Sequence, residues 1–144
     1  MLNDLISDLK SDEGWRSFAY QDHLGFWTIG WGFLIDERRG GELPREIAEQ
    51  WMAYAVTKRW GQLLNRHPWI DDQPDDVQRA LGNMAYQLGV GGVSKFKKML
   101  KALKDGDREL AAREALDSRW AAQTTARAYR VTALIRGELV EQTK

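Results

Sequence analysis

One segment of this chain, residues 17–35, has the composition of β-strands and is flanked by stretches with helical periodicity. Aromatic, β-branched and glycine residues dominate it, and turn-forming residues lie at Gln21-Asp22-His23 and at Gly25. Strands this close in sequence pair with one another, because a parallel pair needs a long crossover connection. The sequence therefore predicts a small antiparallel sheet in an α+β fold that is predominantly helical, and it excludes a doubly wound parallel sheet.

Apolar residues recur at helical spacing through the rest of the chain. Gly14 is expected to end the first helix, and Pro44 suits the first turn of a long one. Gly89, with Gly91 and Gly92 close behind it, is expected to end the helix that begins near residue 75. Helices are predicted over residues 2–12, 44–65, 75–88, 94–104, 107–116 and 125–136.

The composition excludes several classes of protein. The 144 residues are an ordinary globular mix with a net charge of zero, which argues against a dedicated nucleic-acid binder. Cysteine is absent and the only histidines are His23 and His67, so we expect no metal site and no cofactor. No apolar run approaches the length of a membrane span. The first 14 residues are acidic and lack the basic start of a signal peptide, so we expect synthesis in a cytoplasm.

Glu13 is the first candidate catalytic residue. It lies at the C-terminal end of the predicted helix 2–12, where the helix dipole disfavours negative charge, and close to the apolar Trp15 and Phe18. Such surroundings favour the protonated carboxyl group that a general acid needs. Taken alone, a glutamate at this place is more typical of an ordinary surface residue.

Asp22 and Thr28 are the second and third candidates. Asp22 lies in the predicted turn, nine residues after Glu13, and Thr28 follows six residues later in a predicted strand. An aspartate in a turn is common, so it carries little weight by itself. Two carboxyl groups in different surroundings are nevertheless the minimal set for glycoside hydrolysis. One protonates the leaving oxygen, and the other stabilises positive charge or helps to activate water.

The two faces of the strand around Thr28 differ in character, because strand side chains alternate. One face is expected to point into a core and carries Trp27, Ile29, Trp31 and Phe33. The opposite face is nearly bare and carries Thr28, Gly30, Gly32 and Leu34. A bare face suits the close approach of a ligand, although such glycines are also typical of a strand that only twists or bulges.

The spacing of Glu13, Asp22 and Thr28, within the pattern YxDxxGxxTIGxG, resembles the catalytic signature of the phage-type lysozymes, the endolysins of tailed bacteriophages. Residues 80–89, 91–96 and 118–131 resemble the helical lobe of that family, so the resemblance covers nearly the whole chain. It implies one lysozyme-like domain over residues 1–144 with a cleft between two lobes. A sheet-containing lobe (about 13–43) and a connecting helix (about 44–65) would precede a helical lobe (about 66–144), which the helix 2–12 completes.

The resemblance also implies an activity. Family members hydrolyse the β-1,4 bond between N-acetylmuramic acid and N-acetylglucosamine in bacterial peptidoglycan, without a metal or another cofactor. Glu13 would be the general acid, Asp22 the second carboxylate and Thr28 the residue that holds the attacking water. Arg127 matches a supporting arginine that reaches the catalytic glutamate.

Matches to the family's substrate contacts are less complete. Leu34, Tyr86 and Gln87 correspond to positions that line the cleft, with Tyr86 in place of a phenylalanine. Met99 and Glu114 replace polar family residues, a serine and an asparagine. These differences predict altered sugar contacts or altered stability, because the catalytic residues are all present.

Three other functions remain open at this point. A lytic transglycosylase would cut the same bond without a held water, and a catalytically inactive lysozyme-like module would only bind the wall. A lysine-rich helix, Lys95 to Lys104, could perturb an anionic membrane as a side activity. The leading interpretation is a monomeric endolysin whose partner is peptidoglycan, with no nucleic acid bound and no stable membrane insertion. It would accumulate in the host cytoplasm and reach the wall at lysis through a lesion made by a holin.

Overall fold

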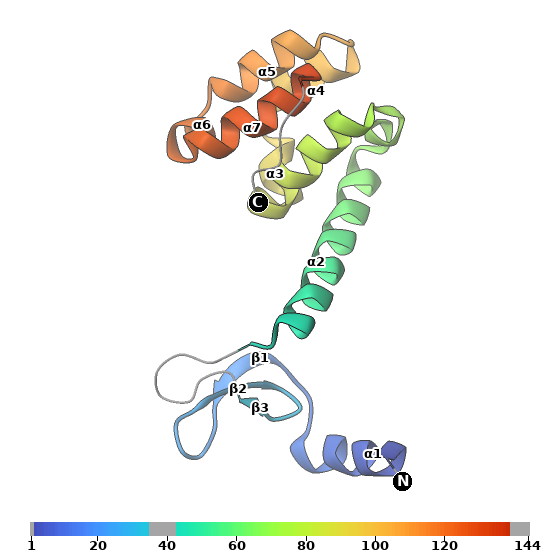
Figure 1. The fold of residues 1–144 in the computed structure, drawn as a ribbon, viewed down its shortest axis with the longest axis vertical. Helices are drawn as coiled ribbons and strands as arrows, with labels where there is room; N and C mark the ends of the chain where they lie inside the picture. The colour runs from blue at the N-terminus through green and yellow to red at the C-terminus, as the bar shows by residue number, and fades with distance from the viewer. Residues whose placement is uncertain (1, 35–42, 139–144) are drawn as a thin grey trace. The chain divides into compact units, whose positions relative to one another are not determined.

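The computed structural model describes residues 2–34 and 43–138 of the chain (Figure 1). Two compact units make up the chain, unit 1 (Met1–Gln50) and unit 2 (Trp51–Lys144). The elements in chain order are α1 (Leu2–Glu13), β1 (Arg16–Gln21), β2 (Trp27–Gly30), β3 (Phe33–Leu34), α2 (Arg45–Arg66), the 3-10 helix η1 (Pro68–Asp72), α3 (Asp75–Ser94), α4 (Lys97–Lys104), α5 (Arg108–Leu116), α6 (Arg119–Gln123) and α7 (Thr125–Arg136). The predicted α+β fold, predominantly helical with a small antiparallel sheet, is confirmed. The predicted division into lobes joined by the helix 44–65 stays a prediction.

Unit 1 contains the sheet, whose strand order is β1-β2-β3 with both pairs antiparallel. Thr28 lies in the central strand, where it is paired with Tyr20 on one side and Leu34 on the other. The register of β1 against β2 shifts between Arg16 and Tyr20, so the pairing is irregular there. The flanking strands β1 and β3 thus hold the Thr28 backbone from both sides.

The expectation about the two faces of β2 is wrong. Trp27 and Phe33 are 45% and 60% exposed, and no apolar side chain is buried among the described residues of unit 1. Thr28 and Gly30, on the face expected to be open, are buried. Within β2 the alternation itself holds, but Thr28 and Gly30 lie on the buried face and Trp27 and Ile29 on the more exposed one. After the strand, the positive φ of Gly30 and Gly32 turns the chain. The Phe33 and Trp15 rings then lie over Gly30.

Unit 2 holds the buried hydrophobic core of the described chain. Its largest fully buried side chains come from the end of α2, from η1 and from α3, α4 and α7: Leu63, Ile70, Val77, Leu81, Met84, Val93, Met99, Leu103, Val131 and Ile135. Gly89 ends the first helical segment of α3, as predicted. With φ 74° and ψ 165° it lies outside helical geometry, and a second helical segment follows the kink and continues to Ser94.

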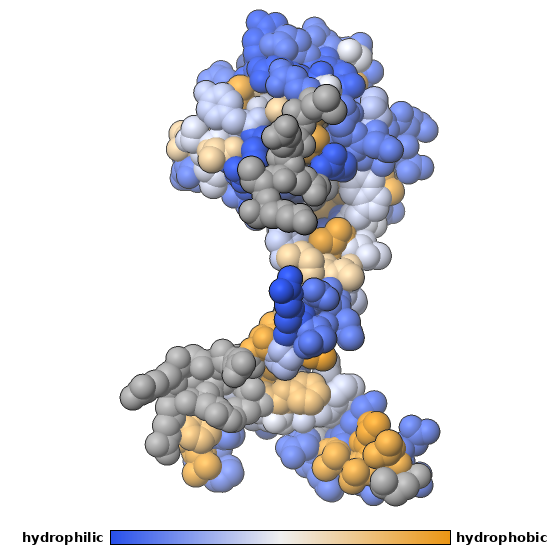
Figure 2. Space-filling view, viewed as in Figure 1, coloured by the Kyte–Doolittle hydropathy of each residue, from blue (hydrophilic) through white to orange (hydrophobic). Residues whose placement is uncertain are grey.

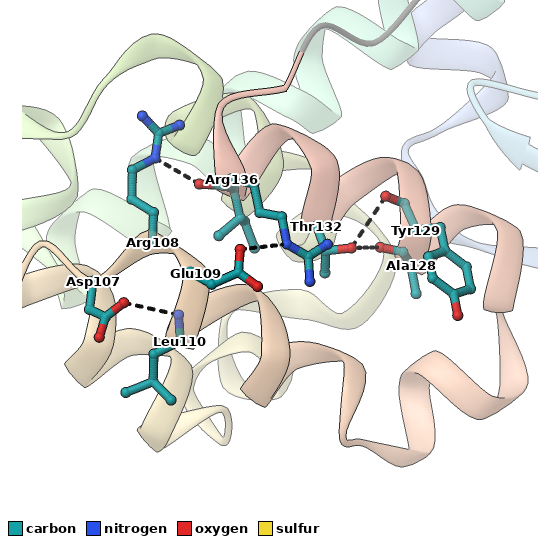
Figure 3. A network of polar contacts seen from close by, with 9 residues as sticks. Asp107, Arg108, Glu109, Leu110, Ala128, Tyr129, Thr132 and Arg136 are labelled. Atoms are coloured by element: carbon teal, nitrogen blue, oxygen red, sulfur yellow. Dashed lines mark hydrogen bonds and ion pairs between the residues drawn. The ribbon is translucent and has the colours of Figure 1, made fainter.

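Polar contacts fix how α5 and α7 pack (Figure 3). Asp107 caps α5 by accepting a hydrogen bond from the Leu110 N–H (3.0 Å). Arg108 donates from Nε to the carbonyl of Ile135 (2.7 Å), near the end of α7. The guanidinium of Arg108 also pairs with Asp76 of α3 (2.7 Å). One arginine therefore ties three helices together.

The lysine-rich helix α4 has its apolar side in the core of unit 2. Met99, Leu100 and Leu103 are buried, while Lys97, Lys98 and Lys104 are exposed. Its apolar face is therefore not free to enter a membrane unless this part of the fold opens. Among the residues that the structure describes, no helix is long and apolar enough to span a membrane.

Candidate active site

Glu13 ends α1, and its exposed carboxyl group lies against the backbone of Gly32. A Cβ atom added to Gly32 would lie 2.8 Å from Glu13 Cδ and closer still to Oε2, and Gly32 has φ +73°. Glycine is thus favoured here by the backbone conformation, and a side chain at this position would displace the Glu13 carboxyl group. The contact depends on the turn after β2, so the sequence pattern alone did not indicate it.

The neighbours expected for Glu13 are not those found. Trp15 and Phe18 are 62% and 83% exposed, so they do not enclose the carboxyl group. Instead, Glu13 shares a pocket of about 320 Å³ with aromatic residues of the β2–β3 turn and apolar residues of α1; its lining is Ile6, Leu9, Lys10, Glu13, Trp31 and Phe33. The acid is therefore next to an aromatic wall that sequence reasoning had placed in a core.

Asp22 is held by the turn between β1 and β2. Its Oδ1 accepts hydrogen bonds from the N–H groups of Leu24 and Phe26, both at 2.9 Å. Its own N–H donates to the carbonyl of Phe26 (2.8 Å), and its carbonyl accepts from the Gly25 N–H (2.9 Å). These bonds fix the carboxylate through one oxygen. Within the described part of the chain, Oδ2 has no hydrogen-bond partner.

Thr28 is connected to Asp22 through the backbone of Phe26. Thr28 is 4% exposed, and its hydroxyl donates a hydrogen bond to the Phe26 carbonyl (3.2 Å), which also accepts from the Asp22 N–H. With its proton committed there, Thr28 Oγ1 has lone pairs that can accept from a further donor. Phe26 is the residue that the sequence analysis missed, because its part is played by backbone atoms.

Glu13, Asp22 and Thr28 therefore all lie in unit 1, and they carry different chemical groups. Glu13 presents a carboxyl group beside an aromatic pocket, while Asp22 Oδ2 in the turn and Thr28 Oγ1 in β2 are acceptors whose residues both bond to the Phe26 backbone. A water molecule can donate two hydrogen bonds. If it donated both to these acceptors, the lone pair on its oxygen would point away from them. This arrangement suits acid-assisted attack by water on a bond between sugars.

Tyr86 and Arg127 line a groove of about 760 Å³ in unit 2, together with Met52, Val56, Arg59, Trp60, Asp75, Gln78, Arg79, Gly82 and Asn83. Tyr86 is 39% exposed, and the Arg59 guanidinium lies 5.8 Å from its ring centroid. Arg59 also donates to the carbonyls of Ala85 and Tyr86 (3.1 and 3.0 Å). The Tyr86 backbone is thus held in place by Arg59, while the side chain stays partly exposed.

Arg127 donates from Nε to Asn83 Oδ1 (2.8 Å), so α7 is linked to α3 at the groove. Asn83 lies 44 residues away in sequence, and no local pattern indicated this partner. The predicted reach of Arg127 to Glu13 stays a prediction. Three arginines (Arg59, Arg79 and Arg127) and one carboxylate, Asp75, give the groove lining an excess of positive charge.

The remaining predicted contacts have different outcomes. Gln87 Oε1 accepts a hydrogen bond from the buried Trp120 (2.9 Å), so part of this amide is used within unit 2. The side chain of Leu34 lies outside the described residues. Met99 and Glu114 both line another pocket of unit 2, of about 350 Å³, and Met99 is also buried in the core. In residues 2–34 and 43–138, no cluster of three or more acidic or histidine side chains could hold a metal ion.

The phage lysozyme family model matches residues 10–136. The chain belongs to the phage lysozyme family. It is 33% identical to the pre-baseplate central spike protein Gp5 of Enterobacteria phage T4 over 88% of this chain, which spans only 26% of that protein. It is 29% identical to the probable T4-type lysozyme 2 of Dictyostelium discoideum, over 93% of this chain and 94% of the relative. It is also 27% identical to the peptidoglycan hydrolase gp36 of Pseudomonas phage phiKMV, over 84% of this chain and 14% of the relative.

Proposed function

We propose that the protein is a muramidase that hydrolyses the β-1,4 bond between N-acetylmuramic acid and N-acetylglucosamine in peptidoglycan. Family membership and the likeness to a peptidoglycan hydrolase support the coarser class, a lysozyme-like cell wall hydrolase and glycoside hydrolase. The observation that carries the finer proposal is that Asp22 and Thr28 are both hydrogen-bonded to the backbone of Phe26, with Asp22 Oδ2 left without a partner among the described residues.

In the proposed reaction, Glu13 donates a proton to the glycosidic oxygen as the bond to the departing sugar breaks. Asp22 and Thr28 accept hydrogen bonds from the two O–H groups of a water molecule, whose lone pair attacks the anomeric carbon from the opposite face. Asp22 takes one proton as attack proceeds, and its negative charge stabilises the developing positive charge on the sugar. Direct attack inverts the anomeric configuration, and it requires carboxyl groups about 6.5–9.5 Å apart, against about 5 Å for a covalent route.

The experiment that tests the proposal is mass spectrometry of purified peptidoglycan after digestion with wild type, Glu13→Gln and Asp12→Asn. Asp12 is the adjacent exposed carboxylate of α1, so its variant controls for lost charge at the same helix end. We expect hydrated, reducing muramic acid ends from wild type and Asp12→Asn, and none from Glu13→Gln. Anhydro ends would make the protein a lytic transglycosylase, and no new ends from wild type would leave a binding module.

The cellular role that fits this activity best is host lysis by an endolysin. The enzyme would act as a monomer on the wall after a holin opens the inner membrane from the cytoplasmic side. A second role is favoured by the likeness to the spike protein, of which the chain spans 26%. In that role, the enzyme would be carried by the virus particle and would open the wall locally. Muramidase activity in washed, intact particles would identify the second role, and its absence there would exclude it.

A further inference from the structure

The kink of α3 at Gly89 changes which partners are available to the backbone before it. Gly89 lies outside helical geometry, so the first helical segment of α3 ends just before it. The last four carbonyls of a helical segment lack the regular N–H partner one turn further along the chain. Ala85 and Tyr86 supply two of these four carbonyls. Such carbonyls take hydrogen bonds from side chains, from water or from a tightened last turn.

Arg59 of α2 is a partner for both carbonyls. Its Nη1 donates to the oxygen of Ala85 (3.1 Å) and to that of Tyr86 (3.0 Å). Nη1 carries two protons, so each oxygen can receive one of them. A positive charge is also favoured at the C-terminal end of a helical segment by the helix dipole. Arg59 forms no ion pair with any described residue, so it is an arginine cap for the first segment of α3.

The cap lies beside an aromatic ring that is accessible to a ligand. Figure 2 shows a mainly hydrophilic surface over α3–α7. From α3 onward, Tyr86 and Tyr129 are the only large apolar side chains that are exposed in the described chain. Tyr86 lines the groove of about 760 Å³, which is within the roughly 300–1,000 Å³ typical of ligand sites. All residues of the groove lie in unit 2, so Arg59 and Tyr86 meet within one unit.

One guanidinium group thus contacts Tyr86 in two ways. It accepts the lone pairs of the Tyr86 carbonyl through Nη1, and it lies 5.8 Å from the ring centroid, within the range of a cation–π interaction. The first contact holds the backbone of Tyr86, and the second favours a ring position beside the guanidinium. A ring that is held before the ligand arrives loses less entropy when it binds.

We propose that Arg59 is a positioning residue for substrate binding: by capping the first segment of α3, it holds the Tyr86 ring in place to contact a sugar of the glycan strand. This inference rests on the proposed function, and on Tyr86 as one of its substrate contacts. Arg59 itself acts through Tyr86 and takes part in no catalytic step. Its loss should therefore change KM and leave kcat nearly as in wild type.

The test is a double-mutant cycle in KM on purified peptidoglycan, with wild type, Arg59→Met, Tyr86→Leu and the double variant. Tyr86→Leu should raise KM about three- to tenfold with little change in kcat. Arg59→Met should raise KM about two- to fivefold when Tyr86 is present, and should have no effect on KM in the Tyr86→Leu background. An equal effect of Arg59→Met in both backgrounds would overturn the inference, as would a wild-type KM for either single variant.

Arg79→Met is the matched control, because Arg79 lines the same groove but forms no ion pair with a described residue. Its effect on KM should be the same with and without the Tyr86 ring, since it removes only charge. A coupling of Arg79 to Tyr86 as large as that of Arg59 would assign the effect to groove charge and contradict the cap.

Arg59→Lys keeps an ammonium group that can donate to carbonyls, so its KM should lie between those of wild type and Arg59→Met. It carries the same cycle if Arg59→Met does not fold. If wild type produces no reducing muramic acid ends, the proposed function fails. If it produces them and the effects of Arg59 and Tyr86 are independent, only this inference fails.

Discussion

Replacement of Gly32 by alanine is the sharpest test of how the structure positions Glu13. The new Cβ would lie 2.8 Å from Glu13 Cδ, whereas ordinary van der Waals contact begins at 3.4 Å. Glu13 Cδ must therefore retreat by at least 0.6 Å, and Oε2, which is closer, by on the order of 1 Å. A misplacement of about 1 Å in a catalytic constellation costs about 100-fold in rate, or about 2.7 kcal/mol of transition-state stabilisation.

The same substitution also strains the backbone, so a control must separate strain from displacement. Gly106 has φ +79°, and no atom lies within 4 Å of an added Cβ there. Alanine in the left-handed conformation costs about 1–2 kcal/mol at either position. Gly32→Ala and Gly106→Ala should therefore lose similar stability, while only Gly32→Ala loses activity.

The assay is the initial rate of release of reducing ends from purified peptidoglycan, at a temperature where circular dichroism shows both variants to be folded. We expect Gly106→Ala to retain wild-type kcat and Gly32→Ala to fall about 100-fold. If Gly32→Ala keeps more than half the rate of Gly106→Ala, the contact with Gly32 does not position the acid and the reasoning fails.

Three further predictions concern other parts of the molecule. Thr28→Val, which keeps the buried volume and removes the acceptor, should lower kcat at least tenfold in the same assay, whereas equal rates for Thr28→Val and wild type would remove the held water. The hydrogen bond from Arg108 lowers the pKa of Asp76 below its ordinary 3.8, so the pair stabilises the fold above that pH and its contribution disappears as the pH falls through the lowered value. Asp76→Asn should accordingly reduce the free energy of unfolding by about 1 kcal/mol in urea at about pH 7 and by much less near about pH 2, and a pH-independent difference would contradict this. Gln87→Leu leaves the buried Trp120 N–H unpaired, so it should lower the midpoint of urea unfolding by an amount that corresponds to about 1–3 kcal/mol, and an unchanged midpoint would show that the bond contributes little.

Local signals were sufficient to predict most elements of the fold. The predicted helix 125–136 matches α7 (Thr125–Arg136), because its apolar periodicity is clear and Gly137 ends it in the left-handed conformation. Gly89 was correctly expected to end its helix, but the helical segment that follows it to Ser94 was not predicted. The strands were predicted but not their faces, since alternation along β2 does not by itself say which of the two faces is buried.

The candidate site, too, could be predicted from the sequence only in part. Asp22 and Thr28 lie within one turn and one strand, so their spacing indicated that they act together. The contact of Glu13 with Gly32 joins residues on either side of a hairpin, and the bond of Arg127 to Asn83 spans 44 residues. Contacts of that kind depend on packing rather than on local spacing. The part played by Phe26 could not be predicted from a residue pattern, because it depends on backbone atoms alone.

The measurement that bears most directly on the proposed reaction is proton NMR of the first muramic acid ends released from peptidoglycan, before the anomers equilibrate. Direct attack by a water held on Asp22 and Thr28 predicts that the α-anomer appears first, because the β-linked bond is inverted. The β-anomer appearing first would instead indicate a covalent intermediate on Asp22, and anhydro ends would leave Thr28 without the water it is proposed to hold.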